Sequence, residues 1–171
     1  METINSEIFT LMYGSIVRQL ITDLEDIGEV NKQLDTMGYN IGVRLIDEFL
    51  AKSRTAACTD FRDSAEKVAK VGFRMFLNTT ANVTNWNPEN TECSLVLEDN
   101  PLTDFVELPE GCSKLKYCNV LCGVIRGALE MVNLQVECDF VKDTLRGDEL
   151  NEIRLKLVSE GTEAYPFKDD D

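Results

Sequence analysis

Apolar side chains recur at helical spacing through the first half of the chain. Residues 6–26 form an amphipathic pattern that begins at Ser6, a favourable N-cap residue, and stops near Gly28, which can end a helix in the left-handed conformation. A second helix is predicted over residues 30–51. The apolar stripes of these two helices comprise Ile8, Met12, Ile16, Leu20 and Leu24, followed by Val30, Leu34, Met37, Ile41, Leu45 and Phe49.

The second half of the chain contains strand-like patterns. Residues 83–86 and 93–98 are predicted as the short strands of one hairpin, because a turn-rich Asn-Pro-Glu-Asn segment separates them. Residues 132–140 alternate apolar and polar side chains, which indicates a half-buried strand, and its expected partner is the segment 153–157. The sequence therefore predicts an α+β fold with an antiparallel sheet and a helix-rich N-terminal half.

Residues 115–131 are the most apolar segment and are predicted as a helix buried on most sides. Cys118 and Cys122 fall on its apolar stripe, so we interpret them as small core residues. On the polar edge, Arg126 and Glu130 stand four residues apart and are expected to form an ion pair.

Two of the predicted helices carry small residues at turn spacing. Gly38 and Gly42 indicate a close approach of the backbone to another helix or to a ligand, and helix packing is the favoured interpretation. In the third predicted helix, residues 60–77 with Thr59 or Asp60 as cap, small residues leave room for a neighbouring helix or for an apolar channel. The residues assigned to this column and its edge are Ala65, Val68, Ala69, Gly72 and Phe76.

The length and the charge of the chain indicate its domain organisation and its possible partners. With 171 residues, 43% of them hydrophobic, the chain is predicted to form one domain over residues 1–160, followed by a mobile acidic tail, residues 161–171. The net charge of −14 argues against binding to nucleic acid. Residues 52–74 nevertheless hold six basic against three acidic side chains. This basic segment is either an ordinary solvated helix face or a contact with anionic membrane or an acidic partner, with Arg62, Lys70 and Arg74 expected to face the membrane.

The chain contains no histidine, which removes Ser-His-Asp and Cys-His nucleophilic sites, histidine-bound haem and zinc sites built on histidine. Its six cysteines form no Cys-x-x-Cys pair, which argues against a structural zinc site. We therefore expect no enzyme, no metal and no separate cofactor. The first residues lack the pattern of a signal peptide, and there is no uncharged apolar run of about 18 residues, so a cytosolic protein with reduced thiols is expected.

Several strings of the sequence together resemble one family. They are MGYNIGVRLIDEFLA, Cys58-Thr-Asp-Phe-Arg, NVTNWNP, LEDNPLTDFVELPE and LCGVIRGALEMVNLQVE. They resemble the Bet-three-type small core subunits of TRAPP, the transport protein particle, and the resemblance extends in register over residues 6–157.

The resemblance implies an α/β plait whose helices cover the sheet, and dimers built through the first two helices, with Ile41 and Leu45 at the interface. It also implies that Cys58 carries a palmitoyl thioester, with the acyl chain buried in the channel beside the third helix. The family has a basic residue directly before this cysteine, where the chain has Ala57. Independently of the family, a helix N-terminus and the nearby Arg54 and Arg62 favour a thiolate.

The resemblance further implies partners and a location. The partners are other TRAPP small subunits, a second copy when the chain is isolated, and, through the complex, an early-secretory Rab GTPase whose nucleotide exchange the complex promotes. The C-terminal segment of the family can approach the nucleotide site of the GTPase. The expected location is cytoplasmic, peripheral on Golgi or endoplasmic reticulum membranes. Two alternatives are a soluble lipid carrier or sensor, which would release its ligand, and a cysteine-dependent acyltransferase, which would lack a histidine base.

Overall fold

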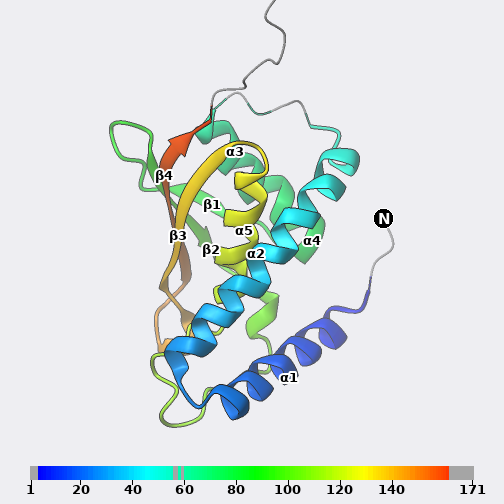
Figure 1. Ribbon diagram of the computed structural model, residues 1–171, viewed down its shortest axis with the longest axis vertical. Helices are drawn as coiled ribbons and strands as arrows, with labels where there is room; N and C mark the ends of the chain where they lie inside the picture. Colours follow the sequence, from blue (N-terminus) through cyan, green and yellow to red (C-terminus); the bar gives the residue numbers. More distant parts are fainter. Residues whose placement is uncertain (1–3, 56–57, 59, 162–171) are drawn as a thin grey trace, which may run out of the picture.

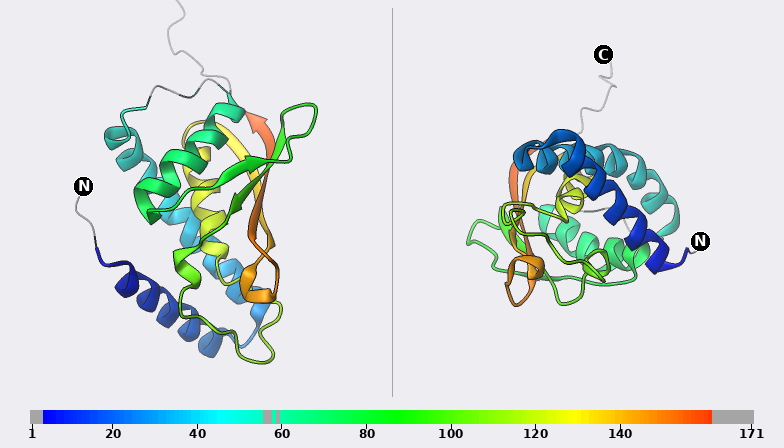
Figure 2. Two further views of the ribbon diagram at one scale, coloured as in Figure 1. Left: turned by 180° about the vertical axis from the view of Figure 1, so that it is seen from behind. Right: turned by 90° about the horizontal axis from the view of Figure 1, so that it is seen from below.

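Helices lie on one side of a four-stranded antiparallel sheet, as the α+β prediction requires (Figures 1 and 2). The computed structural model describes residues 4–55, 58 and 60–161. Its helical elements are α1 (Ser6–Leu24), α2 (Ile27–Lys52), α3 (Phe61–Lys67), the π-helical turn η1 (Val68–Gly72), α4 (Phe73–Leu77), η2 (Pro101–Thr103), α5 (Asn119–Glu130) and η3 (Thr144–Arg146).

The sheet has the strand order β1-β2-β4-β3. Its strands are β1 (Asn82–Thr84), β2 (Glu92–Leu97), β3 (Leu134–Lys142) and β4 (Asn151–Glu160). Both predicted hairpins are present, and β4 lies between β2 and β3, so that one continuous sheet results. The β1–β2 turn is held by Asn87, whose side-chain oxygen accepts hydrogen bonds from the backbone N–H groups of Thr91 (2.8 Å) and Glu92 (3.0 Å).

The predicted ends of the first helix are wrong at both sides. Asn5, not Ser6, is the N-cap, and its side-chain oxygen accepts from the backbone N–H of Glu7 at 2.8 Å. The helix ends at Glu25, which adopts the left-handed conformation with φ 57°. Gly28 is not needed there, because Asp26 already caps α2 by accepting from the N–H of Glu29 at 2.9 Å. Gly28 therefore lies in the first turn of α2.

Four glycines bring α2 and α5 into backbone contact. A Cβ at Gly38 would lie 2.1 Å from the carbonyl oxygen of Val120, and a Cβ at Gly123 would lie 2.1 Å from that of Asp35. Gly42 and Gly127 make the same kind of approach. The predicted packing of the Gly38 region against another helix is confirmed, and α5 in turn packs on β3 (Figure 1).

The segment 115–131 is helical only from Asn119, after a series of turns. Cys118 and Cys122 are completely buried, as predicted. The predicted Arg126–Glu130 pair is wrong, because Arg126 forms its ion pair with Asp35 of α2 and lies over the ring of Tyr39, 4.8 Å from its centroid. The close α2–α5 contact brings Asp35 and Tyr39 of α2 next to Arg126, so Arg126 pairs with α2 and not with the next turn of its own helix.

The same contact decides which face of α2 is buried. The buried positions are Val30, Leu34, Gly38, Gly42 and Ile46. Beyond Leu34 the predicted stripe therefore leaves the core, and Ile41 is 45% exposed. On α1, Tyr13 and Val17 are buried, whereas Ile8 and Met12 of the predicted stripe are 65% and 53% exposed. The expected apolar surface on the first two helices is present.

Candidate functional site

The third predicted helix is not continuous, because a π-helical turn separates α3 from α4. In η1 the carbonyl oxygen of Ala69 accepts a hydrogen bond from the backbone N–H of Ala81 at 3.0 Å, just before β1. Lys70 adds a second link, since its Nζ donates to Oδ1 of Asn82 at 2.7 Å. The π turn thus ties this helical segment to the edge of the sheet, and such turns are frequent at functional sites.

The small-residue column divides at this π turn. Ala65 and Ala69 are completely buried, and Val68 packs against the core. Below them Phe73, not Gly72, takes the buried position, while Gly72 and Phe76 are half-buried. An α-helical turn holds 3.6 residues, so a four-residue repeat drifts around a helix, and the wider π turn takes up this drift.

Gly72 has open space beside it. A Cβ at this position would meet only the carbonyl oxygen of Lys67, at 3.8 Å. This contrasts with the glycines of α2 and α5, which lie against a neighbouring backbone. The backbone of Gly72, at the lower end of the predicted column, is therefore not in contact with a neighbouring element on the side of its Cβ position.

Cys58 is the exposed thiol among the six cysteines. Cys93, Cys112, Cys118 and Cys122 are buried, and Cys138 is half-buried. Burial raises the pKa of the Cys93 thiol to about 12, and it raises that of Cys118 and Cys138 as well. A nucleophilic thiol must be reached by its acyl donor, so accessibility singles out Cys58 for modification.

Aromatic side chains fix the start of α3, just after Cys58. Phe61 contacts Trp86 edge to face with ring centroids 5.8 Å apart. Arg62 lies over the same indole, 5.4 Å from its centroid, and donates to Oδ1 of Asn90 at 3.3 Å. These contacts join α3 to the β1–β2 hairpin, with Asp60 as the N-cap of α3, accepting from the N–H of Asp63. The alternative cap Thr59 lies outside the described residues.

A largely buried cation of α3, Lys67, was missed by sequence reasoning. Its Nζ lies 2.7 Å from Oδ2 of Asp63, and its side chain is only 16% exposed. The hydrogen bond to Asp63 raises the pKa of Lys67 most, and the charge and hydrogen bonding of the Cys58 side chain raise it further, against partial desolvation. The four-residue spacing of Asp63 and Lys67 was the available signal. Arg54 and Arg62, which we expected near the sulfur, have exposed side chains.

The side chains of Arg62, Lys70 and Arg74 are all exposed. Arg62 and Lys70 are nevertheless engaged with Asn90 and Asn82 of the hairpin, so these two cations are held at defined positions. All three cations are therefore on the surface, and two of them are held by hydrogen bonds to the hairpin.

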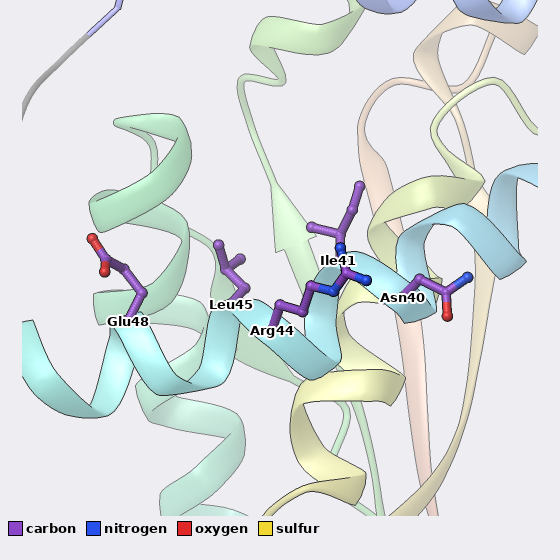
Figure 3. Close-up of a pocket in the computed structure, with 5 residues that line it drawn as sticks. All are labelled: Asn40, Ile41, Arg44, Leu45 and Glu48. Carbon is purple, nitrogen blue, oxygen red and sulfur yellow. The ribbon is translucent and has the colours of Figure 1, made fainter.

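Ile41 and Leu45 line a groove of about 290 Å³ on the exposed face of α2. Their side chains point to the same side of the helix (Figure 3). Polar side chains border them, namely Asn40, Arg44 and Glu48. An apolar centre with a polar rim is the usual composition of a protein–protein contact.

A second surface, on α1, was not anticipated in detail. Leu11 and Arg18 of α1 line a groove of about 230 Å³ together with Asp104 and Phe105 of the loop after η2. Phe105 is 79% exposed, and its backbone is left-handed with φ 62°. A large aromatic side chain in this conformation is uncommon, and exposed aromatic residues are frequent anchors of interfaces. The run DFVELPE was the only signal in the sequence.

No helix in the described ranges is long and apolar enough to cross a membrane. Nor do three or more Cys, Asp or Glu side chains of these residues gather in a way that could hold a metal ion. Ala57 and the tail residues 162–171, which entered the predictions, lie outside the described part of the chain.

Comparison with known proteins gives consistent matches. Residues 9–156 match the family described as transport protein particle (TRAPP) component. The chain is 58% identical, over 91% of its length and 84% of that protein, to trafficking protein particle complex subunit 3 of Dictyostelium discoideum. It is 52% identical, over 91% of its length and 85% of that protein, to transport protein particle subunit bet3 of Schizosaccharomyces pombe.

A solved structure agrees with both. The crystal structure of a trafficking protein particle complex subunit 3 from Naegleria fowleri, covalently bound to palmitic acid, superposes with a TM-score of 0.90 and 52% identity, covering 95% of this chain and all of that one. The family match spans most of the chain and the relatives agree over nearly the same residues, so this protein belongs to the TRAPP component family.

Proposed function

We propose that this chain is a non-catalytic core subunit of a TRAPP complex that tethers vesicles and promotes nucleotide exchange on a Rab GTPase in transport from the endoplasmic reticulum to the Golgi. In this proposal Cys58 carries a palmitoyl thioester whose chain enters the protein beside η1. The observation that carries the acyl site is the exposed thiol of Cys58 next to a helical segment with open space at Gly72.

Two further points support the acyl site. The Naegleria fowleri relative, at 52% identity, was crystallised covalently bound to palmitic acid. In this chain the other five cysteines are buried or half-buried, so that a thioester on a different sulfur would first require the domain to open. A covalent palmitoyl group is then the one non-protein component of the proposed subunit.

We expect the purified chain to carry an acyl adduct that hydroxylamine removes, detected by intact mass under mild conditions. Cys58→Ser should lose the adduct, while Cys138→Ser should keep it. Gly72→Leu should exclude the acyl chain, because the added side chain fills the open space. Gly72→Ala is the control, since its Cβ meets only one atom, at 3.8 Å.

The outcomes separate the proposal from its alternative. A lipid that is extracted without hydroxylamine identifies a soluble carrier or sensor. An unchanged adduct in Gly72→Leu would mean that Ala65, Val68, Ala69, Gly72 and Phe76 do not line the channel. Turnover of the acyl group onto a second acceptor is the result that an acyltransferase would give.

Assembly is proposed through α1 and α2, where the apolar groove with Ile41 and Leu45 is exposed. A second groove, beside Phe105, lies on α1. We infer that these faces receive other TRAPP small subunits in the complex, and a second copy when the chain is isolated. This chain contributes to Rab nucleotide exchange only within the assembled complex. Nucleotide release from the GTPase, measured for the complex with and without this chain, tests this contribution.

Membrane contact is proposed through Arg62, Lys70 and Arg74. Each cation near an anionic surface contributes about 1 kcal/mol, so three contribute roughly 3 kcal/mol, which suits one subunit of a multivalent complex. Changing all three to Glu should reduce flotation of the complex with anionic liposomes, and salt should weaken flotation of the parent. Cys58→Ser should matter less. Flotation that survives the charge reversal but disappears with Cys58→Ser would make the acyl chain an outward anchor instead.

A further inference from the structure

We propose that the acidic loop around η2, with Phe105 as its anchor, is a docking surface for a basic face of another TRAPP small subunit. The inference rests on the proposed assembly through α1, and it names the chemistry of the partner on that side of the chain. The surface consists of Phe105, the groove beside it and the carboxylates of residues 98–110, and it is called the Phe105 surface below.

An ordered turn presents Phe105 to solvent. Phe105 is 79% exposed and is the only exposed aromatic side chain of the described residues. The carbonyl oxygen of Thr103 accepts from the backbone N–H of Val106 at 3.2 Å, which closes a turn around Asp104 and Phe105. The φ of 62° at Phe105 is uncommon for a bulky side chain and costs stability. The fold therefore holds an apolar side chain outward at a cost that packing within the chain does not offset.

The turn is fixed to α1 and to the start of α5. Oγ1 of Thr10 in α1 donates to the carbonyl oxygen of Pro101 at 2.8 Å. Asn100 is 2% exposed, and its Oδ1 accepts from the N–H of Leu102 at 3.2 Å while its Nδ2 donates to the sulfur of Cys118 at 3.2 Å. An anchor whose backbone is already held in place loses little conformational entropy when a partner binds.

The groove of about 230 Å³ lies between α1 and this turn. Leu11 borders it beside Phe105 and is 63% exposed. Tyr117 also lines it and is 4% exposed, and its buried hydroxyl has no hydrogen-bond partner among the described residues. This hydroxyl lies 3.1 Å from the Cβ position of Gly14. Buried hydroxyls are normally hydrogen-bonded, so the free chain leaves one hydrogen-bonding group unused at the groove.

The charge of the surface indicates a basic partner. Residues 98–110 contain five acidic side chains and no basic one. The acids are Glu98, Asp99, Asp104, Glu107 and Glu110. All five are exposed, and none belongs to an ion pair of the described residues. Arg18 of α1 is the single cation of the groove lining. Complementary charge on a partner speeds its association and selects it over other chains.

The same charges argue against a second copy or a membrane as the occupant. A two-fold contact would place the five acids of one copy against the same five of the other. An anionic membrane would be repelled in the same way. The α2 groove is different, because Arg44 and Glu48 border it with both signs of charge. A second copy therefore suits the α2 groove, and a basic subunit suits the Phe105 surface.

The test titrates the full chain with each of the other recombinant TRAPP small subunits by biolayer interferometry. Phe105→Gly should lower the affinity for one of these subunits about tenfold or more, because it removes the anchor. It should not lower Tm, because glycine adopts the left-handed conformation without strain. Phe105→Tyr should bind as the parent does. Val158→Ser is the control, since Val158 is also an exposed apolar residue but lies on β4.

A second arm tests the charge. The combined variant Asp104→Asn, Glu107→Gln and Glu110→Gln should slow association with the same subunit about tenfold and remove most of its salt dependence. The matched control removes three exposed acids from β3 and β4 and should leave the rate unchanged. This control combines Glu137→Gln, Asp139→Asn and Glu160→Gln.

The outcomes separate the inference from the proposed assembly. Equal affinity of the parent and of Phe105→Gly for every subunit overturns the inference, while the assembly through α1 and α2 stands. The charge arm overturns it as well if the acid-free loop keeps the rate and the salt dependence of the parent. If Phe105→Gly abolishes a homodimer instead, the occupant is a second copy and the inference is wrong. If no small subunit binds the parent chain, the proposed assembly and the inference are both refuted.

Discussion

Replacing Gly123 by alanine should destabilise the domain more than any surface substitution. The new Cβ would lie 2.1 Å from the carbonyl oxygen of Asp35 and 2.7 Å from the backbone nitrogen of Tyr39, so α2 and α5 would have to separate. Neither contacting atom belongs to a flexible side chain. Overpacking typically costs about 1–3 kcal/mol, and we expect this substitution at or above the upper end of that range, against a total stability of about 5–15 kcal/mol for a domain.

Gly72→Ala is the matched control for this prediction. Gly72 is also helical, but its Cβ would meet one atom at 3.8 Å, and alanine is favoured over glycine within a helix by roughly 0.5–1 kcal/mol. Urea denaturation followed by circular dichroism should therefore show a large loss for Gly123→Ala and no loss for Gly72→Ala. Equal effects at the two positions would contradict the close α2–α5 contact.

The isolated parent chain should sediment as a dimer, and Leu45→Glu should convert it to a monomer or an aggregate. Leu45 lies in the apolar centre of the α2 groove beside Ile41, where a partner would desolvate a carboxylate. A stable interface buries about 800 Å² per partner, and exposed apolar side chains are found on both α1 and α2.

Sedimentation velocity and light scattering measure this result directly. Val158→Glu is the control, because Val158 is also an exposed apolar residue, 58% exposed, but lies on β4, away from α1 and α2 (Figure 1). It should leave the dimer intact. A well-folded monomer for the parent chain would refute the proposed self-association, and a dimer that survives Leu45→Glu would place the interface elsewhere.

The elements that the sequence predicted correctly are those set by local rules. Helix and strand periods differ, so the order of helices and the two hairpins followed from the spacing of apolar residues. Glycines at turn spacing have few structural uses, and Gly38 and Gly42 therefore indicated backbone contact before its partner was known. Cys118 and Cys122 lay on the stripe of an apolar helix, where burial was the natural outcome.

Which face of each helix is buried could not be predicted from the local spacing of residues. On α2, the apolar stripe and the glycine row have the same period, and the contact with α5 decides that Gly42 faces the core while Ile41 faces outward. Arg126 took its partner from α2 because Asp35 is close only in the folded protein. Such pairings depend on residues that are distant along the chain.

The candidate acyl site, too, was predictable from the sequence only in part. Cys58 and the small residues of α3 were identifiable from the sequence by residue type and spacing. The π turn at Val68–Gly72 was not, since it is stabilised by the hydrogen bond from Ala81, which arrives with the sheet. Phe61 and Arg62 likewise find their partner Trp86 only when the β1–β2 hairpin is in place. Local pattern thus determined which residue types follow the thiol, and tertiary packing decided which of them are buried and what they contact, because such contacts require a second element in place.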